Sequence, residues 1–323
     1  MPATGPRAGR PSGASTAQAV TSCAAIVLLL CAGIGTRASG VPAEPVRVTV
    51  SHVARAVCPG EVVLVRATTS APADAVTGRS PAEALHFART VDPLVWEAVL
   101  GIDISAKAGP VRLIVHAQAG GSAADATHDL VVSPKTFPAR RITVDPKFVD
   151  PPASEMPRIQ REAKQMAAVL AAVSPARLWS GPFAAPAPGP VTSAFGRTSI
   201  INGQRRTPHT GTDFEAAVGT PISAPNAGTV VLSEALYFSG ETVIVDHGLG
   251  VFSFLGHLSR RDVAVGDAVR AGMVVGLSGV TGRITGPHLH WSVRVGPARV
   301  DPMSLLAILG KQSGTGRILE RVS

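Results

Sequence analysis

The stretch Gly286-Pro287-His288-Leu289-His290-Trp291-Ser292-Val293-Arg294-Val295 alternates polar and apolar side chains from His288 onward. Successive side chains of a β-strand point to opposite faces, so this alternation predicts a strand with one buried face. On such a strand His288 and His290 project from the same face, and Leu289 points into a core. The sequence therefore predicts a β domain in which one strand presents two imidazoles.

Short β segments interrupted by glycine surround this strand, among them Val243-Ile244-Val245. The chain of 323 residues contains 33 Gly and 27 Pro, a composition that favours many turns and short strands over long helices. Residues 181–310 are predicted to form an all-β domain that begins with a stiff, Pro- and Ala-rich linker at 181–189. Residues 311–323 are predicted to be a flexible polar tail.

The spacing of apolar residues changes in the segment 151–180. Apolar residues recur there at steps of four and three, which indicates one face of a helix: Ile159, Ala163, Met166, Leu170 and Val173. Ser154 is expected to cap this helix, Pro157 to lie in its first turn, and Pro175 to end it. A single linking helix of this kind would pack on a neighbouring domain or act as a spacer.

Residues 41–150 show the pattern of several short strands. Val46, Val48 and Val50 alternate with polar positions, and turn residues such as Pro59-Gly60 separate the apolar runs. This pattern predicts an immunoglobulin-like β-sandwich, and no catalytic constellation is found in it. The fold class predicted for the whole chain is therefore mainly β, with the sandwich, the linking helix and a C-terminal all-β domain in that order.

The N-terminal 40 residues have the order of a secretory signal. Arg7 and Arg10 precede an apolar run at 19–35, and the small residues Ala38-Ser39-Gly40 follow it. Export to the periplasm or the exterior is expected, with an uncleaved membrane anchor as the competing interpretation. Cys58 would be the only cysteine left after cleavage, so an internal disulfide is excluded.

The formal net charge is +8, and aromatic residues make up only 4% of the chain. A basic exterior suits an anionic partner, although an arginine-biased ordinary surface explains the charge equally well. No basic patch with interleaved aromatic residues and no nucleic-acid-binding motif occurs, so a nucleic-acid partner is not expected.

Two more histidines and one carboxylate of the C-terminal domain complete the pattern begun by His288 and His290, which neither a His-x-His nor a His-x-x-x-Asp motif would establish alone. His209 and Asp213 lie four residues apart, and His257 follows the strand at 243–245. A catalytic zinc needs three protein ligands and an open position, which two His and one carboxylate supply. Amide hydrolysis also needs groups that accept and donate protons, and two further histidines can serve. His247, before a glycine turn, is interpreted as structural.

Residues 191–306 resemble the lysostaphin-type zinc metallopeptidases, which cut peptidoglycan peptides. The resemblance rests on the following segments: Ser193-Ala194-Phe195-Gly196-Arg197, His209 with Asp213, Gly219-Thr220-Pro221-Ile222-Ser223-Ala224-Pro225, Gly228-Thr229-Val230-Val231, His257-Leu258, Val265-Gly266-Asp267-Ala268-Val269 with Ala271-Gly272, and Gly286-Pro287-His288-Leu289-His290.

This resemblance implies that His209, Asp213 and His290 bind one catalytic zinc ion, and that His257 and His288 are catalytic. It also implies a compact all-β fold with an open groove and hydrolysis of peptide cross-links in bacterial peptidoglycan. The sequence departs from the family at Leu255, where an aromatic residue is common, and at Glu241, where Asn is common. The only tyrosine, Tyr237, does not lie upstream of His209, so the identity of an extra oxyanion donor is left open.

Two other functions compete with this one. A non-catalytic cell-wall module that activates another hydrolase would typically have lost ligands, whereas all five positions are filled here. A lipoyl or biotin carrier would have a similar hairpin at 265–272, but it needs a lysine at a turn tip. No lysine lies between Lys164 and Lys311, so the carrier is excluded. Which peptide bond is cut is left open.

Overall fold

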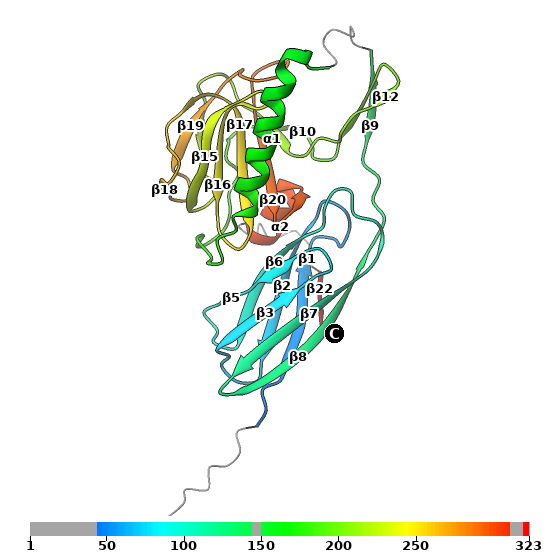
Figure 1. The fold of residues 1–323 in the computed structure, drawn as a ribbon, viewed down its shortest axis with the longest axis vertical. Helices are drawn as coiled ribbons and strands as arrows, with labels where there is room; N and C mark the ends of the chain where they lie inside the picture. The colour runs from blue at the N-terminus through cyan, green and yellow to red at the C-terminus, as the bar shows by residue number, and fades with distance from the viewer. Residues whose placement is uncertain (1–43, 144–149, 311–318, 323) are drawn as a thin grey trace, which may run out of the picture. The chain divides into compact units, whose positions relative to one another are not determined.

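The computed structural model describes residues 44–143, 150–310 and 319–322 (Figure 1). The chain is mainly β, as predicted, and its strands form four sheets within these ranges. The predicted signal at 1–40 lies outside the described residues. Within the described ranges no helix is both long and apolar enough to cross a membrane.

The first 90 described residues contribute to two antiparallel sheets. One has the strand order β22 (Leu319–Val322), β1 (Val48–Ala54), β2 (Val62–Thr69), β6 (Val95–Gly101), β5 (Ala88–Arg89), and the other has the order β4 (Ala84–His86), β3 (Ala75–Arg79), β7 (Gly109–Ala119), β8 (Ser122–Val132). Side chains from both sheets, such as Val65 and Leu113, share one buried cluster. The immunoglobulin-like topology remains a prediction. The end of the predicted tail forms β22, and residues 311–318 lie outside the described residues.

A ten-stranded sheet forms the C-terminal domain. Its main path is β10 (Val191–Ser193), β13 (Thr212–Glu215), β20 (His288–Val295), β17 (Val251–Arg261), β16 (Gly240–Asp246), β15 (Gly228–Leu236) and β18 (Ala268–Val269). Further pairings bring in β14 (Pro221–Ser223), β19 (Val274–Ser278) and β21 (Ala298–Val300). The short helix α2 (Pro302–Leu309) follows β21 and buries Leu305 and Ile308 in the main apolar cluster. Its first turn is capped by the Asp301 carboxylate.

The period-two pattern of β20 determines its two faces. Leu289 and Trp291 are fully buried, whereas His288, His290, Ser292 and Arg294 are half-buried on the other face. Leu289 and Trp291 belong to the main apolar cluster of the domain, which also contains Leu255. The prediction that Leu289 points into the core is confirmed, and the opposite face of β20 is available for a site.

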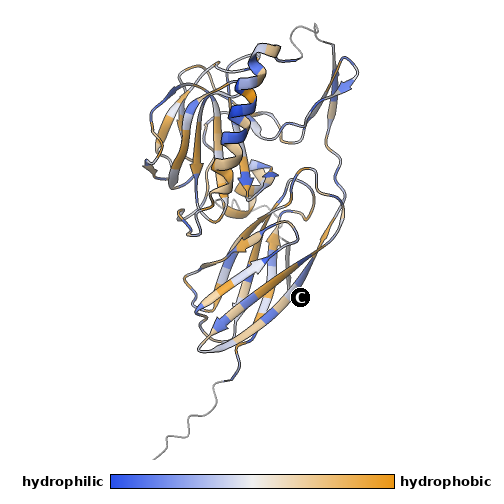
Figure 2. Ribbon diagram, in the orientation of Figure 1, coloured by the Kyte–Doolittle hydropathy of each residue, from blue (hydrophilic) through white to orange (hydrophobic). Residues whose placement is uncertain are grey.

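Helix α1 (Met156–Ala171) packs on the sheet of the C-terminal domain. Its Met166 and Leu170 contact a buried cluster formed by Leu236, Ile244 and Phe252. The helix carries hydrophilic as well as apolar residues, coloured blue and orange in Figure 2, as expected for an amphipathic helix with one packed face. The helix predicted from the apolar periodicity is therefore present, and it packs on the sheet rather than spanning free space.

The start of α1 differs from the sequence-based expectation. Ser154 lies inside a 3₁₀ turn, η2 (Ala153–Glu155), and the helix cap is Glu155, which makes no side-chain capping bond. Pro157 lies in the first turn, as expected, because its missing N–H would have no helical partner there. The helix ends at Ala171, before Pro175.

Two connecting segments pack on the C-terminal domain. In the predicted linker at 181–189, Phe183 is buried and its N–H donates to the carbonyl of Leu309 at 2.8 Å. A small sheet is formed by β12 (Gln204–Arg205), β11 (Thr198–Ile201) and β9 (Ala139–Ile142), in which β9 and β11 are parallel. This sheet brings the segment that follows the N-terminal strands beside the loop that leads to His209.

Candidate metal centre

Strands β13 and β20 bring together the residues predicted as metal ligands. Asp213 is the antiparallel partner of His290, so their side chains leave the sheet on the same face at adjacent positions. His209 lies in the loop just before β13. At Gly211 a Cβ would lie 2.6 Å from the His290 ring and from the Trp291 carbonyl oxygen. Gly211 therefore allows the loop to approach β20 closely enough for His209 to reach the other two ligands.

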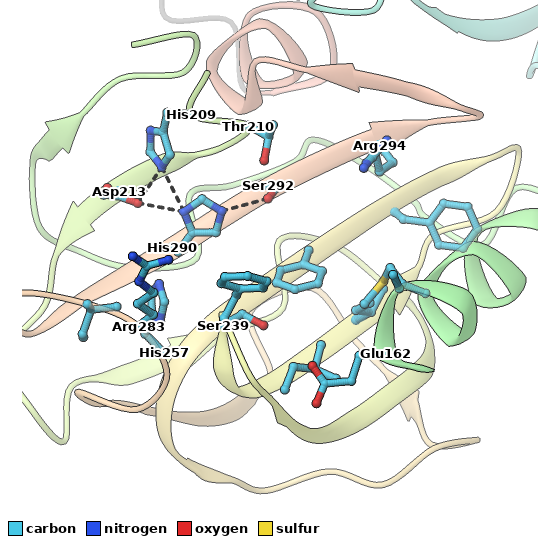
Figure 3. A pocket seen from close by; sticks show the side chains of 18 of the residues that line it. Glu162, His209, Thr210, Asp213, Ser239, His257, Arg283, His290, Ser292 and Arg294 are labelled. Atoms are coloured by element: carbon cyan, nitrogen blue, oxygen red, sulfur yellow. Dashed lines mark hydrogen bonds and ion pairs between the residues drawn. The ribbon is translucent and has the colours of Figure 1, made fainter. Parts of the chain in front are cut away.

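The three side chains converge on one point (Figure 3). His290 Nδ1 lies 2.8 Å from Asp213 Oδ1, and His209 Nε2 lies 3.1 Å from each of these two atoms. Tetrahedral coordination with metal–ligand bonds of about 2.0–2.2 Å places the ligand atoms roughly 3.3–3.6 Å apart. The observed spacing is therefore close to that of three ligands around one small cation.

The outer hydrogen bonds of the two imidazoles favour the same conclusion. His209 Nδ1 donates to the Ala194 carbonyl at 3.2 Å, and His290 Nε2 can donate to Ser292 Oγ at 3.0 Å. With the protons held there, the facing nitrogens carry lone pairs. Two imidazole lone pairs and a carboxylate then point at one another, which is unfavourable unless a cation lies between them. The donor set therefore fits a divalent metal ion.

The two histidines predicted as catalytic lie beside this cluster. The ring centroids of His257 and His288 are 4.9 Å apart, and those of His257 and His290 are 5.9 Å apart. His257 Nδ1 donates to the Thr281 carbonyl at 3.0 Å, and His288 Nδ1 donates to the Gly286 carbonyl at 2.8 Å. The Nδ1 atom of each ring is therefore held by a backbone carbonyl, and the Nε2 atom of His288 lies 3.8 Å from Asp213 Oδ1.

His257 has an unusual backbone conformation. The sequence placed it only after the strand at 243–245, whereas it lies inside β17, and its φ is 64°. Its N–H leaves the regular ladder and donates to the Ser239 carbonyl at 2.7 Å. A non-glycine residue in the left-handed region costs conformational free energy, and such residues cluster at functional sites. This local strain turns the His257 side chain toward the metal cluster.

Burial and neighbouring groups set the protonation of the site. Burial lowers the pKa of His257 to about 4, against an opposing contribution from the hydrogen bond to the Thr281 carbonyl. Burial also lowers the pKa of His290. Burial would raise the pKa of the Asp213 carboxyl, but the adjacent His209 and His290 side chains outweigh it and hold this pKa below its usual range. At neutral pH the two rings are neutral and the carboxylate is ionised.

All five predicted site residues line one cavity of about 590 Å³: His209, Asp213, His257, His288 and His290. The cavity continues over the sheet to α1, where Met166, Phe252 and Phe254 form an apolar wall. The roles of the five residues remain predictions, but the structure places them together. By contrast, His247 is fully buried and bonds through both ring nitrogens, to the Ala227 carbonyl at 2.8 Å and to Ser253 Oγ at 2.9 Å.

Sequence reasoning missed the groups that orient the imidazoles. Ser292 could have been found, because it lies two residues after His290 on an alternating strand and therefore on the same face. No sequence pattern could have identified the carbonyls of Ala194, Thr281 and Gly286 as acceptors. Every residue has a carbonyl, and only the folded chain determines which one lies beside an imidazole ring.

Comparison with known proteins identifies relatives of this domain. Residues 207–302 match the model of peptidase family M23. The peptidoglycan DD-endopeptidase ShyA of Vibrio cholerae serotype O1 is 40% identical over 100 residues, which cover 31% of this chain and 23% of that protein. The DD-carboxypeptidase/endopeptidase Mpg of Neisseria meningitidis serogroup B is 40% identical over 97 residues, which cover 30% of this chain and 22% of that protein. The chain thus spans about a quarter of the length of these curated relatives.

One solved structure extends the similarity beyond this domain. A Pseudomonas aeruginosa protein assigned to peptidase M23 is 33% identical, with a TM-score of 0.62, and the match covers 77% of this chain and 95% of that one. The matched family, the five clustered residues and this nearly complete coverage agree with the resemblance inferred from the sequence. The chain belongs to peptidase family M23.

Proposed function

We propose that the protein is a zinc-dependent endopeptidase that hydrolyses peptide cross-links of bacterial peptidoglycan. The convergence of His209 Nε2, Asp213 Oδ1 and His290 Nδ1 carries the proposal, because it leaves three lone-pair donors facing one point. Two nitrogen ligands and one oxygen ligand form a common protein environment for catalytic zinc. The relatives named as peptidoglycan endopeptidases support the choice of substrate.

Zinc in this position would supply Lewis acidity, which polarises a carbonyl and makes water nucleophilic at neutral pH. The remaining requirements fall on side chains of this chain. Hydrolysis of an amide needs a group that takes a proton from water and a group that gives one to the leaving amine. We assign these tasks to the Nε2 atoms of His257 and His288: the ring whose Nε2 takes the proton from water becomes protonated, and it can then give a proton to the leaving amine. Their Nδ1 atoms are held by carbonyls, so both rings are kept in one orientation.

The cavity is also suited to an extended peptide. It runs from the metal cluster along the sheet, and its far wall is formed by Ile159, Met166 and Leu170 of α1. A non-catalytic module that activates another hydrolase would not need a complete ligand set with its orienting hydrogen bonds. The intact cluster therefore favours an enzyme over such a module.

We further propose that the protein is exported, because its substrate lies outside the cytoplasm. The order of charged, apolar and small residues in 1–40 supports this proposal. The β-sandwich has no assigned chemistry, and we propose that it positions the C-terminal domain or limits access to the cavity.

Digestion of purified peptidoglycan, with mass analysis of the released fragments, tests the proposed function. The zinc-loaded protein should release fragments cut in their peptides, and a chelator should abolish release until zinc is added back. The Asp213→Ala variant should release none. Intact peptidoglycan after incubation with zinc-loaded protein, or fragments cut only in the glycan, would overturn the proposal.

A further inference from the structure

A second cavity also reaches the metal cluster. Its volume is about 550 Å³, and four residues line both it and the cavity that runs to α1: His209, Asp213, Phe238 and Arg283. The two cavities therefore meet at the ligands, and a peptide bound across the metal would extend into both. The cavity toward α1 has an apolar wall with Glu162 and Arg294 beside it, and the second cavity has a different lining.

Arginine side chains dominate this second cavity, which we call the arginine pocket. Its lining contains four arginines, Arg140, Arg197, Arg206 and Arg283, and two carboxylates, Asp150 and Asp213. Asp213 belongs to the metal cluster, and Asp150 pairs with Arg206 at 3.0 Å. Arg140 donates to Ser199 Oγ at 3.2 Å. In the part of the chain that the structure describes, neither Arg140 nor Arg197 is paired with a carboxylate, so the pocket carries excess positive charge.

The backbone holds Arg197 next to a metal ligand. The N–H of His209 donates to the Arg197 carbonyl at 2.9 Å, and the N–H of Gly196 donates to the His209 carbonyl at 2.8 Å. Gly196 has a φ of 82°, and a Cβ there would lie 2.0 Å from the Phe137 ring, so this tight turn requires glycine. The turn therefore fixes the position of Arg197 relative to His209. Arg140 enters the pocket from β9, which pairs with β11 directly after Arg197.

We infer that the arginine pocket binds carboxylate groups of the substrate peptide on one side of the bond that is cut. This inference rests on the proposed function and specifies its substrate class: a peptide with carboxylates near the scissile bond on that side. Guanidinium groups match carboxylates in a planar, two-bond geometry, and such charge-assisted bonds are stronger than neutral ones. Because His209 and Asp213 line the same pocket, the carboxylates lie within the first few residues from the cut.

Two synthetic cross-linked peptides that differ only in their carboxylates provide the test. One carries free carboxylates, and the other carries the corresponding amides. The zinc-loaded wild-type protein should cut the acidic peptide with a KM roughly tenfold lower, and kcat should be similar for both. Raising the ionic strength should increase KM for the acidic peptide only, because salt screens exposed charges.

Two variants test whether Arg140 and Arg197 cause the preference for the acidic peptide. The double variant Arg140→Gln/Arg197→Gln should lose the preference for the acidic peptide and retain its zinc, since both side chains are exposed and neither is a ligand. Arg260→Gln removes an exposed arginine that pairs with Asp262 and lines neither cavity, and it should keep the preference. A preference that survives in the double variant would overturn the inference.

The failure of this inference can be distinguished from the failure of the proposed function. Wild-type protein that cuts both peptides with equal KM would remove the carboxylate site and leave the endopeptidase activity in place. Wild-type protein that binds zinc but cuts neither these peptides nor purified peptidoglycan would overturn the proposed function itself. The comparison of the two peptides with wild-type protein decides the inference even if the double variant does not fold.

Discussion

Alanine substitutions of His288 and His290, made singly, should separate a metal ligand from a residue that handles protons. The two rings lie on the same face of β20, so the sequence pattern alone does not distinguish them. In the structure His290 Nδ1 lies 2.8 Å from Asp213 Oδ1, whereas His288 Nε2 lies 3.8 Å from the same oxygen and outside the three-atom cluster. His290→Ala should therefore lose zinc, and His288→Ala should keep it.

The expected magnitudes follow from this geometry. Zinc bound by four protein ligands is held by roughly 10–16 kcal/mol, or about 3 kcal/mol for each ligand, so His290→Ala should weaken binding by a factor on the order of a hundred or more. His288→Ala should leave the affinity nearly unchanged. Its turnover should fall by a factor on the order of a hundred to ten thousand, as is typical when a positioned acid or base is removed.

Zinc content after dialysis, chelator competition and the rate of peptidoglycan cleavage should be measured on the same preparations. His116→Ala provides the control, because His116 is a half-buried histidine of strand β7 that pairs with Asp125 and lies outside the C-terminal domain. It should keep both zinc and turnover. If His288→Ala lost zinc while His290→Ala kept it, the assignment of the ligand within the His-x-His pair would be wrong. Near-normal turnover of His288→Ala would show that this ring is not catalytic.

Two further predictions concern the surroundings of the site. Ser292→Ala should weaken zinc binding about tenfold, because it removes the acceptor that orients His290. Ser292→Thr keeps a hydroxyl at this position and should restore the affinity. Equal chelator competition for the wild-type protein and both variants would contradict this role. Burial lowers the pKa of His247 to about 4, below its unfolded value of about 6.5, so the neutral ring stabilises the fold above pH 6.5. This contribution, about 3 kcal/mol, should be lost as the pH falls from 6.5 to 4. Denaturant unfolding should show that His247→Gln has a flatter pH profile, and identical profiles would refute the assignment.

The local patterns of the sequence predicted the elements that carry the site. Strict alternation identified β20 and its two faces, because a strand exposes every second side chain to the same environment. Apolar residues that recur at steps of four and three identified α1, whose Met166 and Leu170 pack on the sheet. The prediction failed at the start of this helix. Ser154 is a favourable cap by residue type, yet the preceding 3₁₀ turn moves the helix boundary to Glu155.

The sequence by itself determined which residue types are available to the site, and the family resemblance proposed their roles. Only the tertiary structure decided that His209, Asp213 and His290 converge, that His257 adopts a left-handed conformation, and that carbonyls hold the rings. The arginine pocket also depended on the folded chain, because its side chains come from segments as far apart as Arg140 and Arg283. The physical reason is that periodicity reports the environment of each residue along one element. Distances between elements are set by strand register, tight glycine turns and packing, which involve residues remote in the sequence.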